Sequence, residues 1–177
     1  LASALIAKQD PDATIIVMPS DHIITPVDEF QRALLDAQQL VDQNPSSLIT
    51  FGITPTRPAE TYGYIQAGNP FSSTSFDVVG FKEKPDAQTA NQYLQQGGYY
   101  WNSGIFVWKA QTILNALKAT RPDILEHIDT IVGKHGQPDF DEVFEREFVA
   151  IKGTSIDYAV MEHYKPILMI EALFQWD

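Results

Sequence analysis

The sequence contains no cysteine, which excludes a disulfide framework and thiolate chemistry. Basic residues are also scarce: 12 lysines and arginines stand against 23 aspartates and glutamates, giving a formal net charge of −11. Nucleic acids and anionic membranes bind basic surfaces, so we expect neither as a partner. A phosphorylated small substrate is still compatible with this charge, because a few local cations or a metal ion can neutralise it.

Long apolar runs and several catalytic motifs are missing as well. No run approaches the roughly 18 residues that a membrane span needs, and the first residues show no signal-peptide pattern. The absent cysteines fit a reducing compartment, and we expect a cytoplasmic protein. The chain has no G-x-S-x-G nucleophile motif, no zinc-ligand spacing and no G-x-x-x-x-G-K-[ST] loop.

What is present predicts alternating strands and helices. Continuous apolar runs at 13–18 and 47–53 predict strands that are buried on both faces. Between them, Thr25 and Pro26 predict a helix start, with Thr25 as N-cap. The order helix, strand, helix, strand favours a mostly parallel α/β sheet. Further strands are expected at 62–66, 76–84, 105–110 and 166–173, and further helices at 87–96, 111–120, 122–133, 140–151 and 155–164. Pro85-Asp86 is expected to cap the helix at 87–96, and Gly97-Gly98 to end it.

Both ends of the chain resemble interrupted elements. The sequence starts at Leu1 with LASALIAKQ, which is typical of the end of an amphipathic helix, and it stops within the pattern FQWD. We therefore expect residues 1–177 to form a single partial domain of a longer protein.

Asp21 follows the first predicted strand at its carboxyl end, where open α/β sheets bind ligands. A carboxylate there fits Mg²⁺, which prefers one or two protein carboxylates together with phosphate oxygens. A turn aspartate or a helix N-cap explains the residue as well. The neighbouring His22 has no second ligand at metal-site spacing, so a structural role is the simpler interpretation.

Two further motifs suit a sugar phosphate. In Glu83-Lys84-Pro85 the carboxylate could accept from hydroxyls and the ammonium could meet a phosphate, although a surface ion pair explains the pair equally well. In Tyr62-Gly63-Tyr64 the glycine marks either a close approach of the backbone to a ligand or a bulge in a strand.

Asn102-Ser103-Gly104 places a polar triplet inside an apolar segment. An asparagine amide can donate to one sugar hydroxyl and accept from another, whereas a turn at a hairpin corner explains the composition equally well. Ser155, two residues before Asp157, is explained by N-capping of a helix. All these polar groups suit positioning and charge stabilisation, as phosphoryl-type transfer requires, rather than covalent catalysis.

Six motifs then occur in order: PSDHII, FGITPTRPAETYGYI, FKEKP, YYWNSGIFVW, SIDYAVME and FQWD. Together, over essentially the whole chain, they closely resemble the mannose-1-phosphate guanylyltransferase (GDP-mannose pyrophosphorylase) family of sugar nucleotidylyltransferases. The resemblance implies a Rossmann-like nucleotide-diphospho-sugar transferase fold, with a mixed, mostly parallel sheet flanked by helices and incomplete at the N-terminus. It also implies a reaction in which mannose 1-phosphate attacks the α-phosphorus of GTP with Mg²⁺, giving pyrophosphate and GDP-mannose for polysaccharide biosynthesis.

The resemblance also implies roles for single residues. Asp21 would be a catalytic Mg²⁺ ligand near the α-phosphate. Gly63 would donate its backbone N–H to the mannose, with Tyr62 and Tyr64 shaping the wall of the site. Glu83 would accept hydrogen bonds from mannose hydroxyls.

Lys84 would meet the sugar phosphate as a catalytic cation, and Asn102 would hold another mannose hydroxyl. Asp157 would support the substrate site, without a firm role. The chain departs from the family at Thr61, where a glycine is usual. By its spacing from the preceding tryptophan, Asp177 stands one residue before the family's second metal-binding aspartate.

The family's glycine-rich GTP-binding loop is expected upstream of Leu1, so we expect residues 1–177 alone to be inactive, with an edge of the core exposed. Two alternatives stay open: another sugar-1-phosphate nucleotidylyltransferase, for example one that uses glucose 1-phosphate, or a non-catalytic regulatory subunit of the same fold. These residues do not decide the sugar epimer or a downstream isomerase domain, and a homo-oligomer is compatible with them.

Overall fold

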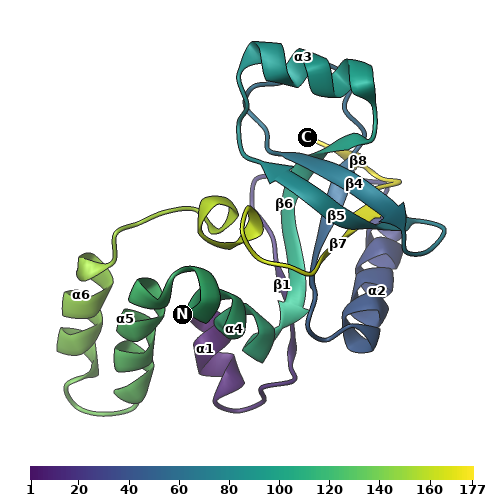
Figure 1. Cartoon of the computed structure of the whole chain (residues 1–177). Coiled ribbons are helices and arrows are strands. Elements are labelled where there is room, and N and C mark those ends of the chain that lie inside the picture. The colour runs from purple at the N-terminus through teal and green to yellow at the C-terminus, as the bar shows by residue number, and fades with distance from the viewer. The chain divides into compact units, whose positions relative to one another are not determined.

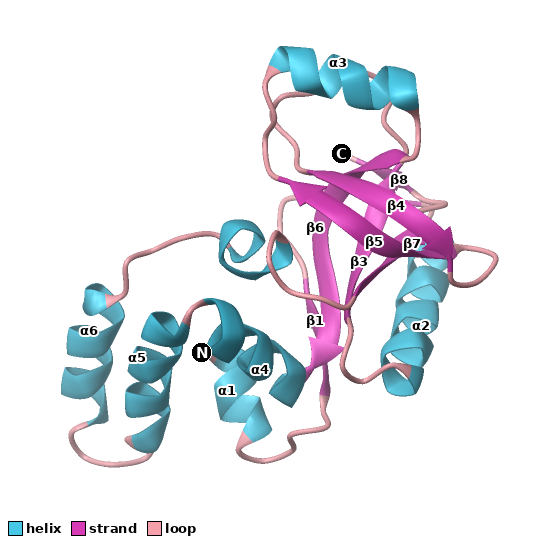
Figure 2. Cartoon of the chain, viewed as in Figure 1, coloured by secondary structure: helices cyan, strands magenta, loops and turns pink.

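A computed structural model describes the whole chain, Leu1–Asp177. The chain divides into two compact units, residues 1–15 with 109–164 and residues 16–108 with 165–177. The first unit consists mainly of helices and is called the helical unit; the second contains most of the sheet and is called the sheet unit (Figures 1 and 2). Because each unit combines segments that are distant in sequence, neither is a simple stretch of chain.

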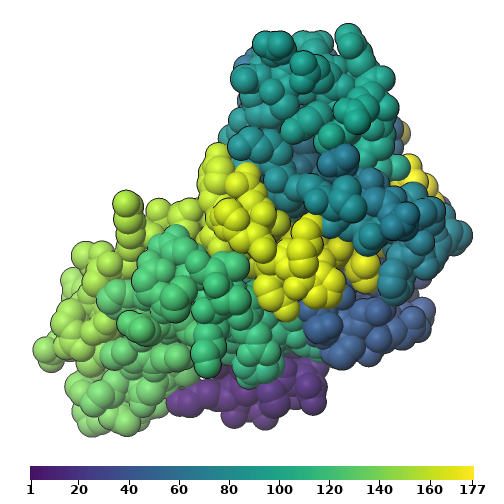
Figure 3. All heavy atoms as spheres, viewed as in Figure 1, coloured from purple at the N-terminus to yellow at the C-terminus, as the bar shows by residue number.

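The helical unit forms largely where the apolar periodicity predicts helices. The predicted helix at 122–133 is confirmed residue for residue, and Pro122 opens it with Asp123 in its first turn. Helix α1 packs on α4 and α5, and α6 packs on α5; Figure 3 shows the purple α1 against the green helices. Its elements are α1 (Ala2–Ala7), α4 (Ala110–Thr120), α5 (Pro122–Gly133), α6 (Phe140–Ala150) and the π-helix η1 (Asp157–Met161).

The sheet unit contains most of the strands and two helices. Figure 1 shows α2 along one face of the sheet and α3 beyond the ends of β4 and β5. Wholly or in part, the unit includes β1 (Thr14–Val17), β2 (Ile24–Thr25), α2 (Val27–Gln43), β3 (Leu48–Ile53), β4 (Tyr64–Pro70), β5 (Ser75–Lys82), α3 (Ala87–Gln96), β6 (Tyr99–Lys109), β7 (Ile167–Glu171) and β8 (Gln175–Trp176).

The main sheet has the order β1-β6-β3-β7-β5-β4, with an additional pairing of β4 and β6, and β2 pairs with β8 in a separate ribbon. β3 and β7 pair in parallel, whereas β3–β6, β4–β5, β4–β6 and β5–β7 are antiparallel pairs. The predicted mostly parallel sheet is therefore wrong: the sheet is mixed and mostly antiparallel. The reason is that β6 lies between β1 and β3, so these two strands are not neighbours as a βαβ unit would make them.

Burial follows strand position. β3 lies inside the sheet and is buried almost throughout, as predicted. β1 was expected to be buried on both faces, but it lies at the edge of the sheet, and its Ile16 and Val17 are 42% and 41% exposed. An edge strand lacks a neighbour on one side, which explains this difference.

At the helix ends, one prediction is wrong and two are confirmed. Thr25 belongs to β2, and the N-cap of α2 is Pro26, which makes no side-chain cap bond. Asp86 caps α3 as predicted, because its side chain accepts from the Thr89 backbone N–H at 2.7 Å. Gly97 ends α3 as predicted, with a left-handed φ of 72°.

Two apolar clusters fix the sheet unit. Ala37 and Val41 of α2 pack on Ile49, Phe51 and other residues of β3, β6 and β7. A smaller cluster under α3 joins Ala59, Tyr64, Ala90 and Trp101. No helix is both long enough and apolar enough to cross a bilayer.

Candidate functional site

Asn102, Ser103 and Gly104 lie within one continuous strand, β6, which rules out the alternative of a turn at a hairpin corner. Thr50 pairs with Phe106 and Gly52 with Asn102, so two steps along β3 face four steps along β6. The surplus residues form a bulge, in which Gly104 adopts a left-handed φ of 72°. A bulge of this kind redirects the side chains beside it.

The Asn102 side chain is held from within the fold. Its Oδ1 accepts from the Gly104 backbone N–H at 3.3 Å and lies 3.0 Å from Thr50 Oγ1. Thr50 Oγ1 also lies 3.1 Å from the Ile105 carbonyl oxygen. Its single proton can serve only one of these two acceptors at a time. Because the Gly104 N–H and the Thr50 hydroxyl both face Oδ1, the amide suits a ligand as a donor rather than as an acceptor.

Gly63 brings Glu83 and Asn102 together. Its carbonyl oxygen accepts from the Asn102 backbone N–H at 2.8 Å. A Cβ on Gly63 would overlap Glu83 Oε2 and would lie 3.4 Å from Asn102 Cβ. The sequence left open whether this glycine marks a close approach or a bulge, and the structure shows a close approach by the Glu83 carboxylate.

Glu83 and Lys84 follow β5 and face different surroundings. Glu83 is 8% exposed, whereas the Lys84 side chain is 57% exposed, and Lys84 Nζ lies 3.2 Å from Glu83 Oε1. Lys84 adopts a φ of 44°, which is costly for a residue other than glycine. The ion pair between these residues is present, but it is not the surface pair of the alternative interpretation, because Glu83 is buried. The site therefore combines a desolvated carboxylate with an accessible ammonium.

The two tyrosines around Gly63 occupy different environments. Tyr62 is half-buried, and its ring centroid lies 5.0 Å from that of Trp101 and 5.1 Å from that of Trp176. Tyr64 is 1% exposed and packs 5.4 Å from Tyr93 in the cluster under α3. Tyr64 is thus a core residue, and its role in the wall of a ligand site stays a prediction.

Arg57 is a residue that the sequence reasoning missed. Its Cζ lies 5.7 Å from the ring centroid of Tyr62 and 5.5 Å from that of Trp101, in cation–π contact. The chain's other three arginines, Arg32, Arg121 and Arg146, all contact carboxylates. The only signal in the sequence was its position within FGITPTRPAETYGYI, five residues before Tyr62 and seven before Tyr64.

Asp21 is exposed in the bend that leads to β2. The next residue, His22, accepts a hydrogen bond at Nδ1 from Trp176 Nε1 at 2.9 Å, which agrees with its predicted structural role. Ile23 and Asp177 exchange backbone hydrogen bonds of 2.8 and 3.1 Å. The PSDH and FQWD segments, which lie at opposite ends of the sequence, are therefore adjacent in the sheet unit.

The donor set around Asp21 limits the kind of metal site. No group of three or more histidine, aspartate or glutamate side chains is arranged to hold a metal ion. Mg²⁺ needs only one or two protein carboxylates when phosphates supply other oxygens. Asp21 therefore fits a Mg²⁺ ion that binds together with a phosphorylated substrate, not one held by this chain's residues alone.

Comparison with known proteins gives the family. Residues 1–148 match the profile of the family described as Nucleotidyl transferase. The chain belongs to the nucleotidyl transferase family. It is 37% identical over 98% of its length to mannose-1-phosphate guanylyltransferase RfbM of Salmonella typhimurium, and 36% identical over 98% to mannose-1-phosphate guanylyltransferase of Escherichia coli. It covers 36% and 38% of these proteins, so it spans little more than a third of their length.

The family profile and the curated relatives confirm the resemblance seen in the motifs, and solved structures share the fold. Mannose-1-phosphate geranyltransferase from Thermus thermophilus gives a TM-score of 0.85 at 26% identity, covering 99% of this chain and 49% of that one. Mannose-6-phosphate isomerase from Helicobacter pylori gives 0.84 at 31% identity, covering 99% and 68%.

Asp157 of this nucleotidyl transferase belongs to the helical unit. It opens the π-helix η1, and its carbonyl oxygen accepts from the Glu162 backbone N–H at 3.0 Å. Ser155 Oγ accepts from the Tyr158 backbone N–H at 3.5 Å, but the N-cap of η1 is Ile156, so Ser155 is not the N-cap that the sequence predicts. The supporting role predicted for Asp157 stays a prediction.

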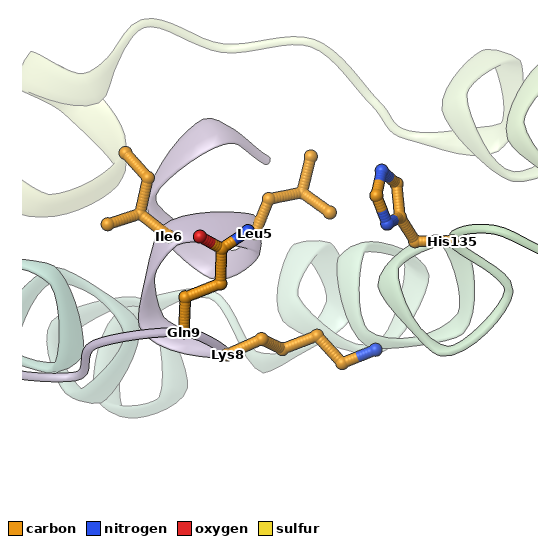
Figure 4. Close-up of a pocket in the computed structure, with 5 residues that line it drawn as sticks. All are labelled: Leu5, Ile6, Lys8, Gln9 and His135. Atoms are coloured by element: carbon orange, nitrogen blue, oxygen red, sulfur yellow. The ribbon is translucent and has the colours of Figure 1, made fainter.

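The helical unit also has a shallow recess of about 260 Å³, lined by Leu5, Ile6, Lys8, Gln9 and His135. Figure 4 shows the His135 ring across the recess from the residues of α1. Lys8 Nζ donates to the Val132 carbonyl oxygen at 2.7 Å, so its charge already serves the end of α5. The mostly apolar recess lacks the convergent polar groups found around Gly63.

Proposed function

We propose that this chain forms the sugar-phosphate part of a mannose-1-phosphate guanylyltransferase, which makes GDP-mannose and pyrophosphate from GTP and mannose 1-phosphate. The convergence of Gly63, Glu83 and Asn102 carries the proposal, and the names of the most similar curated proteins support its substrates. Because the chain spans little more than a third of those relatives, the activity is proposed for the longer protein and not for residues 1–177 alone.

The proposed reaction is a single displacement at phosphorus. A phosphate oxygen of mannose 1-phosphate forms a bond to the α-phosphorus of GTP, and the bond from that phosphorus to the bridging oxygen breaks. The electron pair of the broken bond leaves with pyrophosphate. No covalent intermediate with the protein is needed, so the polar residues serve to position the substrates and to stabilise charge.

Each residue of the cluster has a proposed task. The buried Glu83 carboxylate accepts hydrogen bonds from mannose hydroxyls, and these bonds gain strength because the group is largely shielded from water. The Asn102 amide donates to another hydroxyl, and the Gly63 backbone N–H donates to the sugar. The exposed Lys84 ammonium, tethered beside Glu83, meets the sugar phosphate as a point charge.

Asp21 is the proposed ligand of Mg²⁺ in the longer protein. A bound Mg²⁺ ion would offset the negative charge on the phosphoryl oxygens during transfer. The contribution of this chain is to present the Asp21 carboxylate on a short bend that leads into the β2–β8 ribbon.

The first test uses the full-length protein. Pyrophosphate release with Mg²⁺ would be measured over four nucleoside triphosphates and several sugar 1-phosphates, with the maximum expected at GTP and mannose 1-phosphate. A maximum at another pair would overturn the substrate assignment. No release from a well-folded protein would overturn the proposed activity and favour a non-catalytic subunit.

Asp21→Asn tests the metal ligand. We expect a loss of turnover of about 100-fold or more with an unchanged melting temperature, because the side chain is exposed. Asp36→Asn, an exposed carboxylate on α2, is the matched control and should keep full turnover. Equal turnover in both variants would remove Asp21 from the metal site.

A further inference from the structure

The hydrogen bond between Trp176 and His22 can run in only one direction. An indole N–H is a donor only, so His22 Nδ1 must be the acceptor across the 2.9 Å separation. The imidazole is therefore held with its proton on Nε2. The two rings meet edge to face at 80°, with centroids 5.1 Å apart, so Trp176 fixes both the tautomer and the orientation of His22.

Trp176 also contacts the opposite side of the site. Its centroid lies 5.1 Å from that of Tyr62, which in turn lies 5.0 Å from Trp101. Tyr62 directly precedes Gly63, and Trp101 directly precedes Asn102. A continuous row of ring contacts thus runs from the residue after Asp21 to the residues before Gly63 and Asn102.

The backbone alone gives the Asp21 segment little support. β2 and β8 each contain two residues, and their ribbon is separate from the main sheet. Even with the backbone bonds between Ile23 and Asp177, so short a ribbon cannot rigidly place a carboxylate that lies outside it. Ile24 and Trp176 pack on the apolar cluster of α2 and the main sheet, and the side-chain row from His22 to Trp101 adds a connection to the residues before Gly63 and Asn102. Trp101, at the end of that row, belongs to β6 and is 5% exposed.

We propose that His22 and Trp176 are positioning residues, which hold Asp21 in register with the cluster of Gly63, Glu83 and Asn102. The inference rests on the proposed function, since it takes Asp21 as a Mg²⁺ ligand and the cluster as the sugar site. A sugar phosphate bound at the cluster presents its phosphate at a fixed distance from the sugar. The metal ligand must be held at the matching place, and small displacements of such groups lower rates strongly.

Variants of the full-length protein separate the hydrogen bond from the ring contacts. Trp176→Phe keeps an aromatic ring and removes the donor, and His22→Phe keeps a ring and removes the acceptor. His22→Gln offers an amide oxygen as a new acceptor. Trp108→Phe is the matched control, because it deletes a buried indole N–H that has no hydrogen-bond partner.

The main measurement is the dissociation constant of Mn²⁺, used as a paramagnetic substitute for Mg²⁺, in the presence of saturating GDP-mannose. Electron paramagnetic resonance of the free ion reports it without turnover. We expect Trp176→Phe and His22→Phe each to weaken Mn²⁺ binding about two- to tenfold, the range given by the net value of one hydrogen bond. The double variant should be no weaker than either single variant, His22→Gln should recover most of the loss, and Trp108→Phe should match the wild type.

A second measurement needs no variant. Nitrogen-15 NMR of the wild-type protein, at a pH where its imidazoles are neutral, should show His22 unprotonated at Nδ1 and protonated at Nε2. A proton on Nδ1 would overturn the proposal. So would Mn²⁺ affinities in Trp176→Phe equal to those in Trp108→Phe, or additive losses in the double variant. If the wild type itself binds no Mn²⁺ with GDP-mannose, the proposed function fails instead, so the two failures are distinguishable.

Discussion

The sheet unit and the helical unit use their polar residues in different ways. In the sheet unit, buried polar groups bond to partners far along the chain, as Thr50 does with Asn102. In the helical unit, the charged pairs of Arg121 with Asp123 and of Lys134 with Asp139 join near neighbours at the surface. A buried long-range bond fixes a side chain in one place, whereas an exposed local pair contributes little. The same type of substitution should therefore have different consequences in the two units.

Gly63→Ala should give the largest effect. The added Cβ would overlap the Glu83 carboxylate, which is buried beside it. The carboxylate is the far end of a side chain and can move away, so we expect a stability loss of only about 1 kcal/mol. The displaced carboxylate should instead lower kcat/KM for mannose 1-phosphate by about 100-fold in the full-length protein. Steady-state kinetics and urea unfolding would measure the two quantities.

Gly133→Ala is the matched substitution in the helical unit. No atom lies within 4 Å of an added Cβ at this last residue of α5. We expect a gain in stability of about 0.4–1 kcal/mol, because alanine restricts the unfolded chain, and unchanged kinetics. If Gly63→Ala kept wild-type kinetics as Gly133→Ala should, Glu83 would not be a sugar-binding residue.

Thr50→Val in the sheet unit and Thr120→Val in the helical unit form a second matched pair. Their effects should differ by less than those of the glycine pair, again with the larger loss in the sheet unit. Thr50 is fully buried, and its hydroxyl serves Asn102 Oδ1 and the Ile105 carbonyl oxygen. Valine would remove this donor from both acceptors and leave Asn102 Oδ1 with the Gly104 N–H, so we expect a stability loss of about 1–3 kcal/mol and a higher KM for the sugar phosphate. Thr120 Oγ1 donates to the Ala116 carbonyl oxygen within α4, and its loss should stay within about 0.5 kcal/mol.

Asn102→Ala extends the Thr50 comparison. In the full-length protein it should lower kcat/KM by the equivalent of about 1–3 kcal/mol. If Thr50 acts by holding the amide, its substitution should add little to the kinetic loss once Asn102 is absent. Fully additive kinetic losses would mean that Thr50 affects the site by another route.

Local signals explain which parts of the fold were predictable from the sequence. The Asp86 cap and the glycine at position 97 delimit α3 within a few residues, and Pro122 marks the start of α5. Sheet order was not predictable in this way, because the insertion of β6 between β1 and β3 depends on pairing over long sequence separations. The mostly parallel sheet and the fully buried β1 were both wrong for this reason.

The candidate site was likewise predictable in its local features and not in its long-range contacts. Gly63, Glu83 and Asn102 were selected by residue type within motifs, and the structure brings them together. Their support was not predictable: Thr50 is 52 residues from Asn102, and Trp176 is 154 residues from His22. Nothing local in the sequence indicates that Gly104 and Thr50 occupy the acceptor oxygen of the Asn102 amide.

Acid should produce the smallest of these effects at the surface pair of Arg121 and Asp123 in the helical unit. The hydrogen bond from Arg121 lowers the pKa of Asp123 to about 2, whereas an unfolded chain has a value near about 3.9. Because the folded pKa is the lower one, the pair's contribution is complete above about pH 4 and is lost as the pH falls through about 2. The difference in melting temperature between the wild type and Asp123→Asn should therefore be small and constant above pH 4, and should vanish towards pH 2.

Unfolding measured between pH 4 and pH 2 also distinguishes the buried bond of Thr50 in the sheet unit from the surface pair in the helical unit. The Thr50 hydroxyl and the Asn102 amide do not ionise in this range, so the stability difference caused by Thr50→Val should keep its size between pH 4 and pH 2. A Thr50→Val difference that faded with acid would show that its buried bond depends on a titrating neighbour. An Asp123→Asn difference that persisted at pH 2 would show that the ion pair is not its source. Circular dichroism melts of the three proteins at matched ionic strength would decide both points, because salt screens the exposed pair and leaves the buried neutral bond unchanged.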